Sequence, residues 1–422
     1  MSDEPRRGIG RLFGGLRRRL DPDSETMRQS VRWLAHKLPE LFDKMQRQSV
    51  EMQELHRELE LQQRSMGALT RDIGWVRRAT TRQRAITAEL FQRAALQERP
   101  VEREQYLRNR MARIVRSDLP IVIGPWTGEV GFELMYWIPF LQGLRQTYPL
   151  ETSRLIVISR GGVRAWYGHV GGDYVETFDI TTPDAFRAAT EAVKKQRNPR
   201  AFEKTLVRAA MRTRGLRRVH LIHPSLMYEL FWSFWAYRTT ISDVDRFSSF
   251  RLLPPAGPLP PGLPDEYVAV RFYFSDCFPD TPSNRAFIAR TIESLAARTH
   301  VVLLNTPFAV DDHSDFVIAR SDRVHIIAEH MLPSTNLATQ TAVIARARAF
   351  VGTYGGYAYL APFCGVNSIA FYSRRTFKRQ HLDLAHRVFD RLGAARLLPV
   401  DLRAADAVEL AFGSAASAHQ PA

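Results

Sequence analysis

Apolar residues in the first third of the chain recur at alternating steps of three and four, which is the heptad spacing of a coiled coil. The pattern runs from Met27 to Val76, with Gln48 and Gln62 as polar residues at core positions. The sequence therefore predicts a helical coiled-coil region over residues 23–117, through which copies of the chain associate. A helical hairpin folded back on its own domain is the alternative.

From residue 118 onward, short apolar runs alternate with segments of helical periodicity. This alternation predicts parallel sheets covered by helices on both faces. The expected strands are LPIVIG, RLIVISR, RRVHLIHP, YVAVRFY, HVVLLNT, VHIIA, AFVGTYG and VNSIAFYS. The expected helices are GFELMYWIPFLQGLRQTYP, NRAFIARTIESLAART, NLATQTAVIARA and GYAYLAPFCG.

A proline-rich segment, LLPPAGPLPPGLPDE, divides this part of the chain at residues 252–266. Such a segment continues neither a helix nor a sheet and acts as a semi-rigid spacer. It separates one expected Rossmann-like domain, 118–251, from a second, 267–412, and a disordered tail is expected at 413–422. Two such domains joined by a hinge predict a cleft where the carboxyl ends of their strands meet.

The chain has 422 residues and a formal net charge of +15, and about half of that excess lies before residue 120. An excess of this sign favours anionic partners. Within residues 1–22, RRGIGRLFGGLRRRL suits an amphipathic segment on an anionic membrane surface, with a disordered basic tail as the alternative. Nucleic acid is disfavoured, because the basic residues do not cluster with aromatic residues in a known binding module.

No apolar run is long enough to span a membrane, and the N-terminus lacks the apolar core of a signal peptide. Cys277 and Cys364 lie far apart in apolar surroundings, which favours free thiols in a reducing compartment. We therefore expect a cytoplasmic protein that is at most peripheral on the inner membrane.

Acidic residues stand in the first glycine-rich turn, within IVIGPWTGEVGFELMYWIPFL. Glu129 and Glu133 lie where a strand passes into a helix, so either carboxylate is a candidate general base at the cleft. The structural alternative is an acid that interacts favourably with the dipole at a helix N-terminus.

A second glycine-rich turn follows the strand that ends at Gly352. Thr353, Gly355 and Gly356 lead into a helix whose first N–H groups are unpaired, and such a terminus attracts negative charge. A diphosphate fits there. The alternative is that the glycines only allow a tight turn and close packing of helix on strand.

This second turn, together with Leu360-Ala361 and Gly365-Val366, resembles the donor site of GT-B glycosyltransferases, and of the lipopolysaccharide heptosyltransferase-like group in particular. GEVGFELMYWIPFLQGLRQTYP resembles that group's acidic turn in the first domain. The resemblance implies two Rossmann-like domains of GT-B type facing a cleft. It covers about residues 119 to 412 and does not include the coiled coil.

The resemblance leaves two positions for the base. Counting from Pro139 places the group's acidic residue at Glu133, whereas aligning the glycine places it at Glu129, after Gly128. This chain departs from the group in having Glu in place of Asp, and Phe132 separates the glycine from Glu133. We favour Glu133.

The resemblance places the donor diphosphate at Thr353, Gly355, Gly356 and Tyr357. Arg271, at the end of YVAVR, resembles the basic residue that several GT-B families set opposite the phosphates, with a structural salt bridge as the alternative. Ser275 adds a donor on the following loop. The acidic run VDDHSD is more typical of a solvated loop than of a metal site, so no metal or other cofactor is expected.

The sequence thus favours a metal-independent, inverting glycosyltransferase of bacterial surface-polysaccharide assembly. Its expected partners are a nucleotide-sugar donor, a glycan or lipid-linked acceptor and further copies of the chain. Two alternatives remain: an enzyme like the polysaccharide pyruvyl transferases, and a non-catalytic coiled-coil scaffold with a degenerate GT-B body. Donor and acceptor identity depend on loop shape.

Overall fold

The computed structural model divides the chain into two compact units, Met1–Ala94 and Ala95–Ala422. The structure describes isolated positions between Arg32 and Glu58, and then residues 99–191, 195–254, 257–308 and 314–404. The positions described in the first unit are helical and polar. The apolar core positions of the predicted coiled coil, the basic tail 1–22 and the tail 413–422 lie outside the described residues, so those interpretations stay predictions.

The second unit begins with helix α3 (Arg99–Val115), which packs on helix α8 (Ser225–Trp235). Met111 of α3 is fully buried, and the Arg103 guanidinium donates to the carbonyl of Glu229 over 3.1 Å. The last part of the helical region predicted over 23–117 therefore belongs to the α/β unit, because its apolar face is covered by α8.

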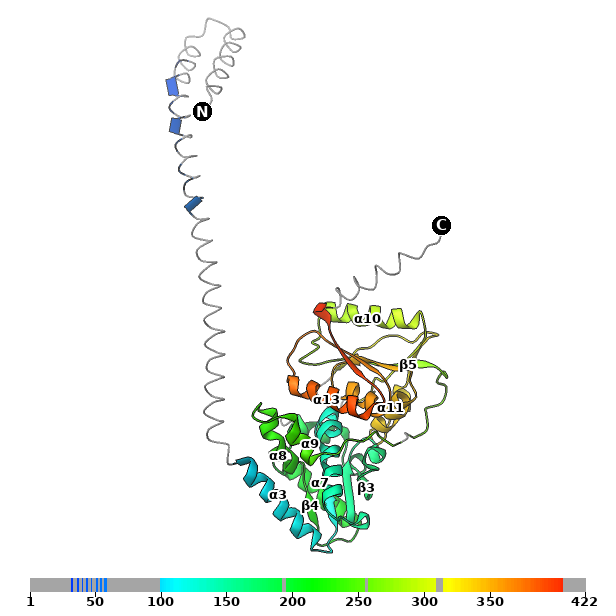
Figure 1. Ribbon diagram of the computed structural model, residues 1–422. Helices are drawn as coiled ribbons and strands as arrows, with labels where there is room; N and C mark the ends of the chain where they lie inside the picture. Colours follow the sequence, from blue (N-terminus) through cyan, green and yellow to red (C-terminus); the bar gives the residue numbers. More distant parts are fainter. Residues whose placement is uncertain are drawn as a thin grey trace. The chain divides into compact units, whose positions relative to one another are not determined.

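The first α/β domain is built on a four-stranded parallel sheet of order β3-β2-β1-β4 (Figure 1). Its strands are β1 (Ile121–Ile123), β2 (Leu155–Ser159), β3 (Asp173–Glu176) and β4 (His220–Ile222). Its helices in the described residues are α4 (Val130–Phe132), α5 (Ile138–Thr147), α6 (Pro183–Thr190), α7 (Ala201–Thr213), α8 and α9 (Ile241–Phe247). The strands β1 and β2 are buried along their whole length and apolar except for Ser159, as expected for a sheet covered on both faces.

The second domain carries a six-stranded parallel sheet of order β12-β11-β10-β5-β7-β9. Its strands are β5 (Tyr267–Arg271), β7 (His300–Leu303), β9 (Val324–Ile326), β10 (Ala349–Thr353), β11 (Ser368–Tyr372) and β12 (Leu397–Asp401). Its helices in the described residues are α10 (Pro282–Ala296), α11 (Asn336–Ala345), α12 (Gly356–Phe363) and α13 (Arg379–Leu392). A short antiparallel pair, β6 (Tyr273–Phe274) and β8 (Ser314–Asp315), flanks this sheet. The two parallel sheets confirm the predicted Rossmann-like α/β fold.

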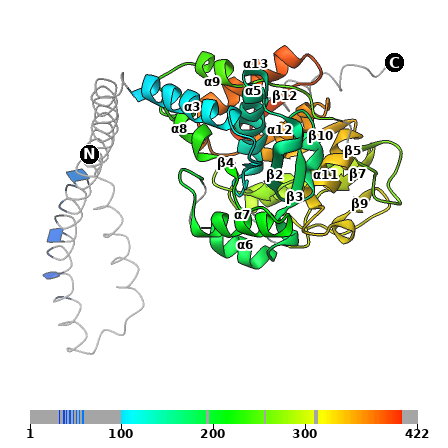
Figure 2. The same ribbon diagram turned by 90° about the horizontal axis from the view of Figure 1, so that it is seen from below.

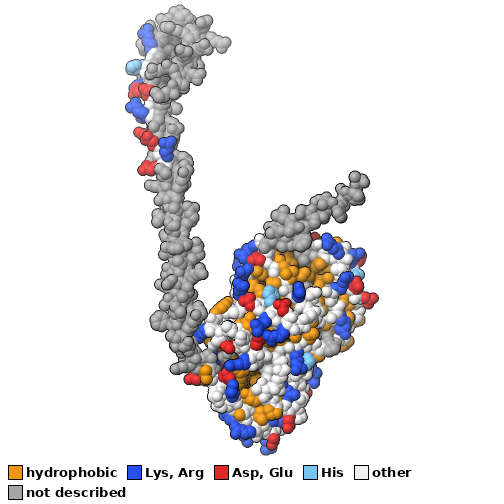
Figure 3. Space-filling view, in the orientation of Figure 1, with side chains coloured by type: hydrophobic (Ala, Val, Ile, Leu, Met, Phe, Trp, Pro, Cys, Tyr) orange, Lys and Arg blue, Asp and Glu red, His pale blue; other side chains and the backbone are white. Residues whose placement is uncertain are grey.

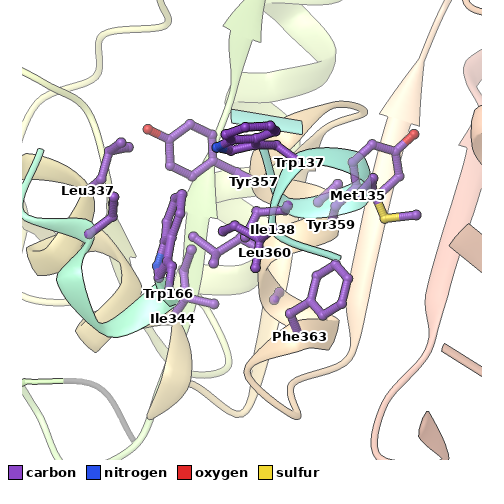
Figure 4. Close-up of a cluster of buried hydrophobic side chains, with 14 of the residues drawn as sticks. Met135, Trp137, Ile138, Trp166, Leu337, Ile344, Tyr357, Tyr359, Leu360 and Phe363 are labelled. Carbon is purple, nitrogen blue, oxygen red and sulfur yellow. The ribbon is translucent and has the colours of Figure 1, made fainter. Parts of the chain in front are cut away.

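The two domains share one apolar core where they meet (Figure 4). Trp137 and Trp166 of the first domain lie beside Leu360 of α12, and the Trp166 indole N–H donates to Thr341 Oγ1 of α11 over 3.0 Å. Large apolar interfaces of this kind oppose relative domain motion. A packed apolar interface thus joins the two domains, and the space between them that the sequence predicts lies beside this interface.

Helix α13 connects the end of the second domain to the first (Figure 2). Gln380 donates to the carbonyl of Phe234 over 3.3 Å, and Lys378, just before the helix, donates to the carbonyl of Trp235. Asp245 of α9 accepts ion pairs from Arg387 and Arg391 at 2.8 and 3.0 Å. This connection was not predicted from the sequence, although α13 is strongly amphipathic.

The proline-rich segment lies along the second domain. The Leu253 N–H donates to the carbonyl of Phe363 over 2.8 Å, and Arg346 donates to the carbonyl of Gly257 over 2.9 Å. These contacts hold the spacer against α11 and α12.

Candidate functional site

A cavity of about 680 Å³ lies between the two domains at the carboxyl ends of their strands. Its wall includes residues 127–132 after β1 and 354–357 after β10, which are the two glycine-rich turns predicted from the sequence. Arg160 after β2 and Arg271 at the end of β5 also line it. The structure thus brings together elements far apart in the chain, at the edge where α/β proteins bind ligands.

The two glycine-rich turns touch each other, and their glycines are needed for that contact. A Cβ atom on Gly356 would lie 2.9 Å from the Gly131 nitrogen and 3.0 Å from the Val130 Cβ. A Cβ atom on Gly355 would lie 2.0 Å from the Tyr273 hydroxyl oxygen. These glycines therefore allow close packing, as the alternative interpretation held, and they also line the cavity.

Glu133 lies inside the core and does not line the cavity. It begins a π-helical turn, Glu133–Trp137, between α4 and α5. Its carboxylate accepts hydrogen bonds from Ser159 Oγ and Tyr167 OH, both at 2.6 Å, and an ion pair from Arg160 at 3.4 Å. Burial raises the pKa of Glu133, against the lowering effects of Arg160, Ser159 and Tyr167. The preference for Glu133 as base is therefore revised, because its oxygens face protein donors and not a space that an acceptor can enter.

Arg160 connects buried Glu133 to the first glycine-rich turn. While one guanidinium nitrogen pairs with Glu133, another donates to the carbonyl of Gly128 over 2.7 Å. The guanidinium is largely buried, and part of it faces the cavity. Glu133 and Arg160 together hold the backbone immediately before Glu129.

Glu129 lies at the cavity wall with its side chain 45% exposed. Lys195 Nζ pairs with its carboxylate at 3.0 Å and stands 3.2 Å from the ring centre of Phe132. Of the two candidate glutamates, Glu129 alone can be reached by a molecule in the cavity.

Arg271 is held by protein partners at the cavity wall. Its guanidinium pairs with Asp315 at 3.2 Å, donates to Gln340 Oε1 over 2.7 Å and stacks 4.1 Å from the ring centre of Tyr357. It is 6% exposed. The salt-bridge alternative thus describes its contacts, since Asp315 balances its charge.

The remaining predicted donor-site residues divide into lining and structural positions. Ser275 and Tyr357 line the cavity. Thr353 is fully buried, and its hydroxyl bonds to both the N–H and the carbonyl of Tyr273, at 3.0 and 2.8 Å. Thr353 therefore joins β10 to β6 and does not face a ligand.

Several residues that form the wall were not predicted from the sequence. Lys195 and Arg197 precede α7, and Lys378 and His381 mark the start of α13. Tyr136 OH shares a 2.5 Å hydrogen bond with His381 Nδ1, and burial, with the charges of Lys195 and Lys378, lowers the His381 pKa to about 3. The basic runs KKQR and RRTFKRQH could have indicated these positions.

Aromatic rings form much of the same wall. They come from α8 and the π-helical turn on one side and from the 354–359 segment on the other: Tyr136, Tyr228, Trp232, Trp235, Tyr354, Tyr357 and Tyr359. Against these rings the cavity presents six Lys or Arg side chains and three Asp or Glu side chains, in the part of the chain that the structure describes. The site therefore suits an anionic ligand with a flat or apolar part.

A buried polar network supports the first glycine-rich turn from behind. Glu203 of α7 accepts from the Arg200 N–H at 2.7 Å and from Gln196 Nε2 at 2.9 Å, and it lies 3.3 Å from His223 Nε2. Gln196 Oε1 in turn accepts from the Thr127 N–H. Burial opposes ionisation of Glu203, but the hydrogen bonds and charges of His223 and Arg200 outweigh it and bring its pKa to about 2.

We expect this network to make the free energy of unfolding depend on pH. Because folding lowers the Glu203 pKa from 4.5 to about 2, its stabilisation is complete above pH 4.5 and is lost as pH falls towards 2. Glu203→Gln should lower the free energy of unfolding at pH 7 by roughly 1–3 kcal/mol, because buried donors lose a charged acceptor. Urea unfolding of both proteins at pH 7 and pH 3.5 measures this. The same difference in free energy of unfolding between the two proteins at both pH values would contradict this prediction.

Within the described residues, no helix is both long and apolar enough to cross a membrane, and no three His, Cys, Asp or Glu side chains gather closely enough to bind a metal.

No protein-family model matches the sequence, and a search of the curated proteins finds no relative. Solved structures do resemble it. The glycosyl transferase family 9 protein of Veillonella parvula is 12% identical, with 70% of this chain and 90% of that chain covered and a TM-score of 0.38. The E. coli heptosyltransferase WaaC with ADP is 15% identical, with 70% and 99% covered and a TM-score of 0.35.

A putative UDP-N-acetylglucosamine 2-epimerase from Listeria monocytogenes also resembles the chain, at 11% identity, with 72% and 99% covered and a TM-score of 0.29. The structural neighbours thus include the heptosyltransferase group that the sequence motifs resemble. Likeness at these TM-scores assigns no role to any residue, so the cavity itself must carry the functional inference.

Proposed function

We propose that the chain is a glycosyltransferase that moves a sugar from a nucleotide-sugar donor to a glycan or glycolipid acceptor. The observation that carries the proposal is the cavity between two parallel-sheet domains, in which cations, aromatic rings and the Glu129 carboxylate face one space. A nucleotide sugar matches this wall, because it combines a flat base, an anionic diphosphate and a polar sugar.

Glu129 is the general base in this proposal. It takes the proton of an acceptor hydroxyl while that oxygen attacks the anomeric carbon from the face opposite the leaving group. The bond from that carbon to the phosphate oxygen breaks, and the nucleoside diphosphate leaves with its electron pair. The sugar configuration is therefore inverted. Cations at the wall stabilise the charge that develops on the departing phosphate.

The wider setting follows from the sequence. We propose that the enzyme acts in bacterial surface-polysaccharide assembly, without a metal, on the cytoplasmic side of the inner membrane. The heptad pattern supports association of copies through the coiled coil. Light scattering on a chain that lacks residues 1–94 tests this association: a monomer is expected, and an unchanged assembly size would contradict it.

A thermal-shift screen tests the proposed activity. We expect at least one of UDP, GDP, ADP, CMP or their sugar conjugates to raise the melting temperature, because a ligand that binds only the folded state stabilises it by mass action. The matching free nucleosides are the control, since they keep the base and lose the phosphates. No shift with any nucleotide would favour the non-catalytic scaffold. A shift with phosphoenolpyruvate and with no nucleotide would favour the pyruvyl transferase-like enzyme.

A further inference from the structure

Three of the cations that line the cavity are Lys195, Arg197 and Lys378. Lys195 and Arg197 lie on the segment between α6 and α7, and Lys378 lies immediately before α13. The side chains therefore come from segments nearly two hundred residues apart and meet at one part of the wall. Figure 3 shows Lys and Arg side chains, with Asp and Glu among them, across the middle of the drawn face of the α/β unit.

Each cation is positioned by a ring or a carbonyl. The Arg197 guanidinium stacks 4.1 Å from the ring centre of Trp232, and no described acidic side chain pairs with it. The Lys378 ammonium donates to the carbonyl of Trp235, also on α8. Lys195 is held between Glu129 and the Phe132 ring. Glu129 thus pairs with one of the three cations, whereas a ring and a carbonyl position the other two.

The pKa of Lys378 indicates that Arg197 lies close to it. Burial and the charge of Arg197 lower the pKa of Lys378. Like charges repel, so bringing cations together at this wall is unfavourable until an anion enters. Arg271, where the resemblance placed the phosphates, differs because Asp315 and Gln340 already occupy its donors.

We propose that Lys195, Arg197 and Lys378 form the anion-binding subsite of the cavity, for a phosphate-type group. The proposal rests on the proposed function for its substrate: the anion is either the diphosphate of the donor or an acidic group of the acceptor. Arg197 and Lys378 supply charge-assisted hydrogen bonds to it. Lys195, which pairs with Glu129, lines the same cavity and adds a third positive charge.

Calorimetric titration with inorganic pyrophosphate, without added metal, tests the subsite. The double variant Arg197→Met, Lys378→Met should bind pyrophosphate at least about 10-fold more weakly than the unmodified chain, because charge-assisted hydrogen bonds are lost. Arg187→Met is the matched control: its side chain lines the same cavity from α6, and we expect less than about a 2-fold change. Because Lys378 holds α13, Arg197→Met alone is measured too, together with the melting temperature of every variant.

If the control and the double variant lost pyrophosphate affinity equally, the subsite would be wrong, because the loss would then come from the general positive charge of the cavity. So would unchanged pyrophosphate affinity in the double variant, or no pyrophosphate binding at all. Competition between pyrophosphate and the nucleoside diphosphate found in the screen assigns the subsite to the donor, and simultaneous binding assigns it to the acceptor. If nucleotides bind and the double variant is unaffected, only the subsite fails. If pyrophosphate affinity falls as expected and no nucleotide binds, only the proposed transferase fails.

Discussion

Replacing Glu129 by Gln is expected to lower turnover by roughly 10²- to 10⁴-fold, which is the usual effect of removing a general base. The amide keeps the shape of the side chain and cannot take the acceptor proton. The affinity for nucleotide should not fall, because Glu129 contributes no cation to the phosphates and its own negative charge pairs with Lys195. Release of nucleoside diphosphate, measured with a mixed pool of acceptor glycans, gives the rate.

Glu191→Gln provides the matched control for this prediction. Glu191 is an exposed acid that lines the same cavity, near Arg187. Its loss removes the same charge without removing the proposed base. Turnover that survives Glu129→Gln, or falls equally in both variants, would show that Glu129 is not the base.

Replacing Glu133 by Ala is expected to lower the free energy of unfolding by roughly 3–5 kcal/mol, the usual cost of breaking a buried ion pair. The change leaves Arg160 without its counter-charge and leaves the Ser159 and Tyr167 hydroxyls without their acceptor. Urea unfolding followed by tryptophan fluorescence measures the change.

Glu133→Gln removes the charge and keeps the volume of the side chain, so it measures the contribution of the charge to stability alone. The amide oxygen can still accept from Ser159 and Tyr167, so we expect this variant to lose less stability than the alanine. A loss below about 1 kcal/mol for Glu133→Ala would contradict the structural role, since typical buried pairs exceed it. Folded Glu133→Gln should keep its turnover, because Glu133 does not line the cavity and contacts the first glycine-rich turn only through Arg160.

The alternation of apolar runs was enough to predict the helices that follow β1 and β10 and the strands of both parallel sheets except β3 and β12. Those two are edge strands with several residues that are not buried, so they carry a weaker apolar signal. Buried strands such as β1 and β5 are recognisable because every residue in them is apolar or nearly so. The sequence did not predict on which surface a helix packs, because that depends on segments far away in the chain. The apolar periodicity of α3 is the same whether the helix packs on another copy of the chain or on α8. The amphipathic pattern of α13 likewise does not indicate that this helix packs on the first domain.

The site was predicted at the level of loops and missed at the level of side chains. Both glycine-rich turns line the cavity, because their position after a strand is readable from sequence. Whether a carboxylate points outward depends on the local helix geometry: the π-helical turn that begins at Glu133 lies among residues facing the core. The contacts of Arg271 with Asp315 and Gln340 join segments far apart in the chain, which no local motif contains.

The central claim is that the cavity between the two domains takes a nucleoside diphosphate. A crystal structure of the chain soaked with the nucleotide that gives the largest thermal shift tests it most directly. The account predicts the nucleotide between residues 127–132 and 354–357, with its phosphates within hydrogen-bonding distance of protein donors and Glu129 facing the sugar side. A nucleotide bound elsewhere on the molecule, with this cavity empty, would contradict it.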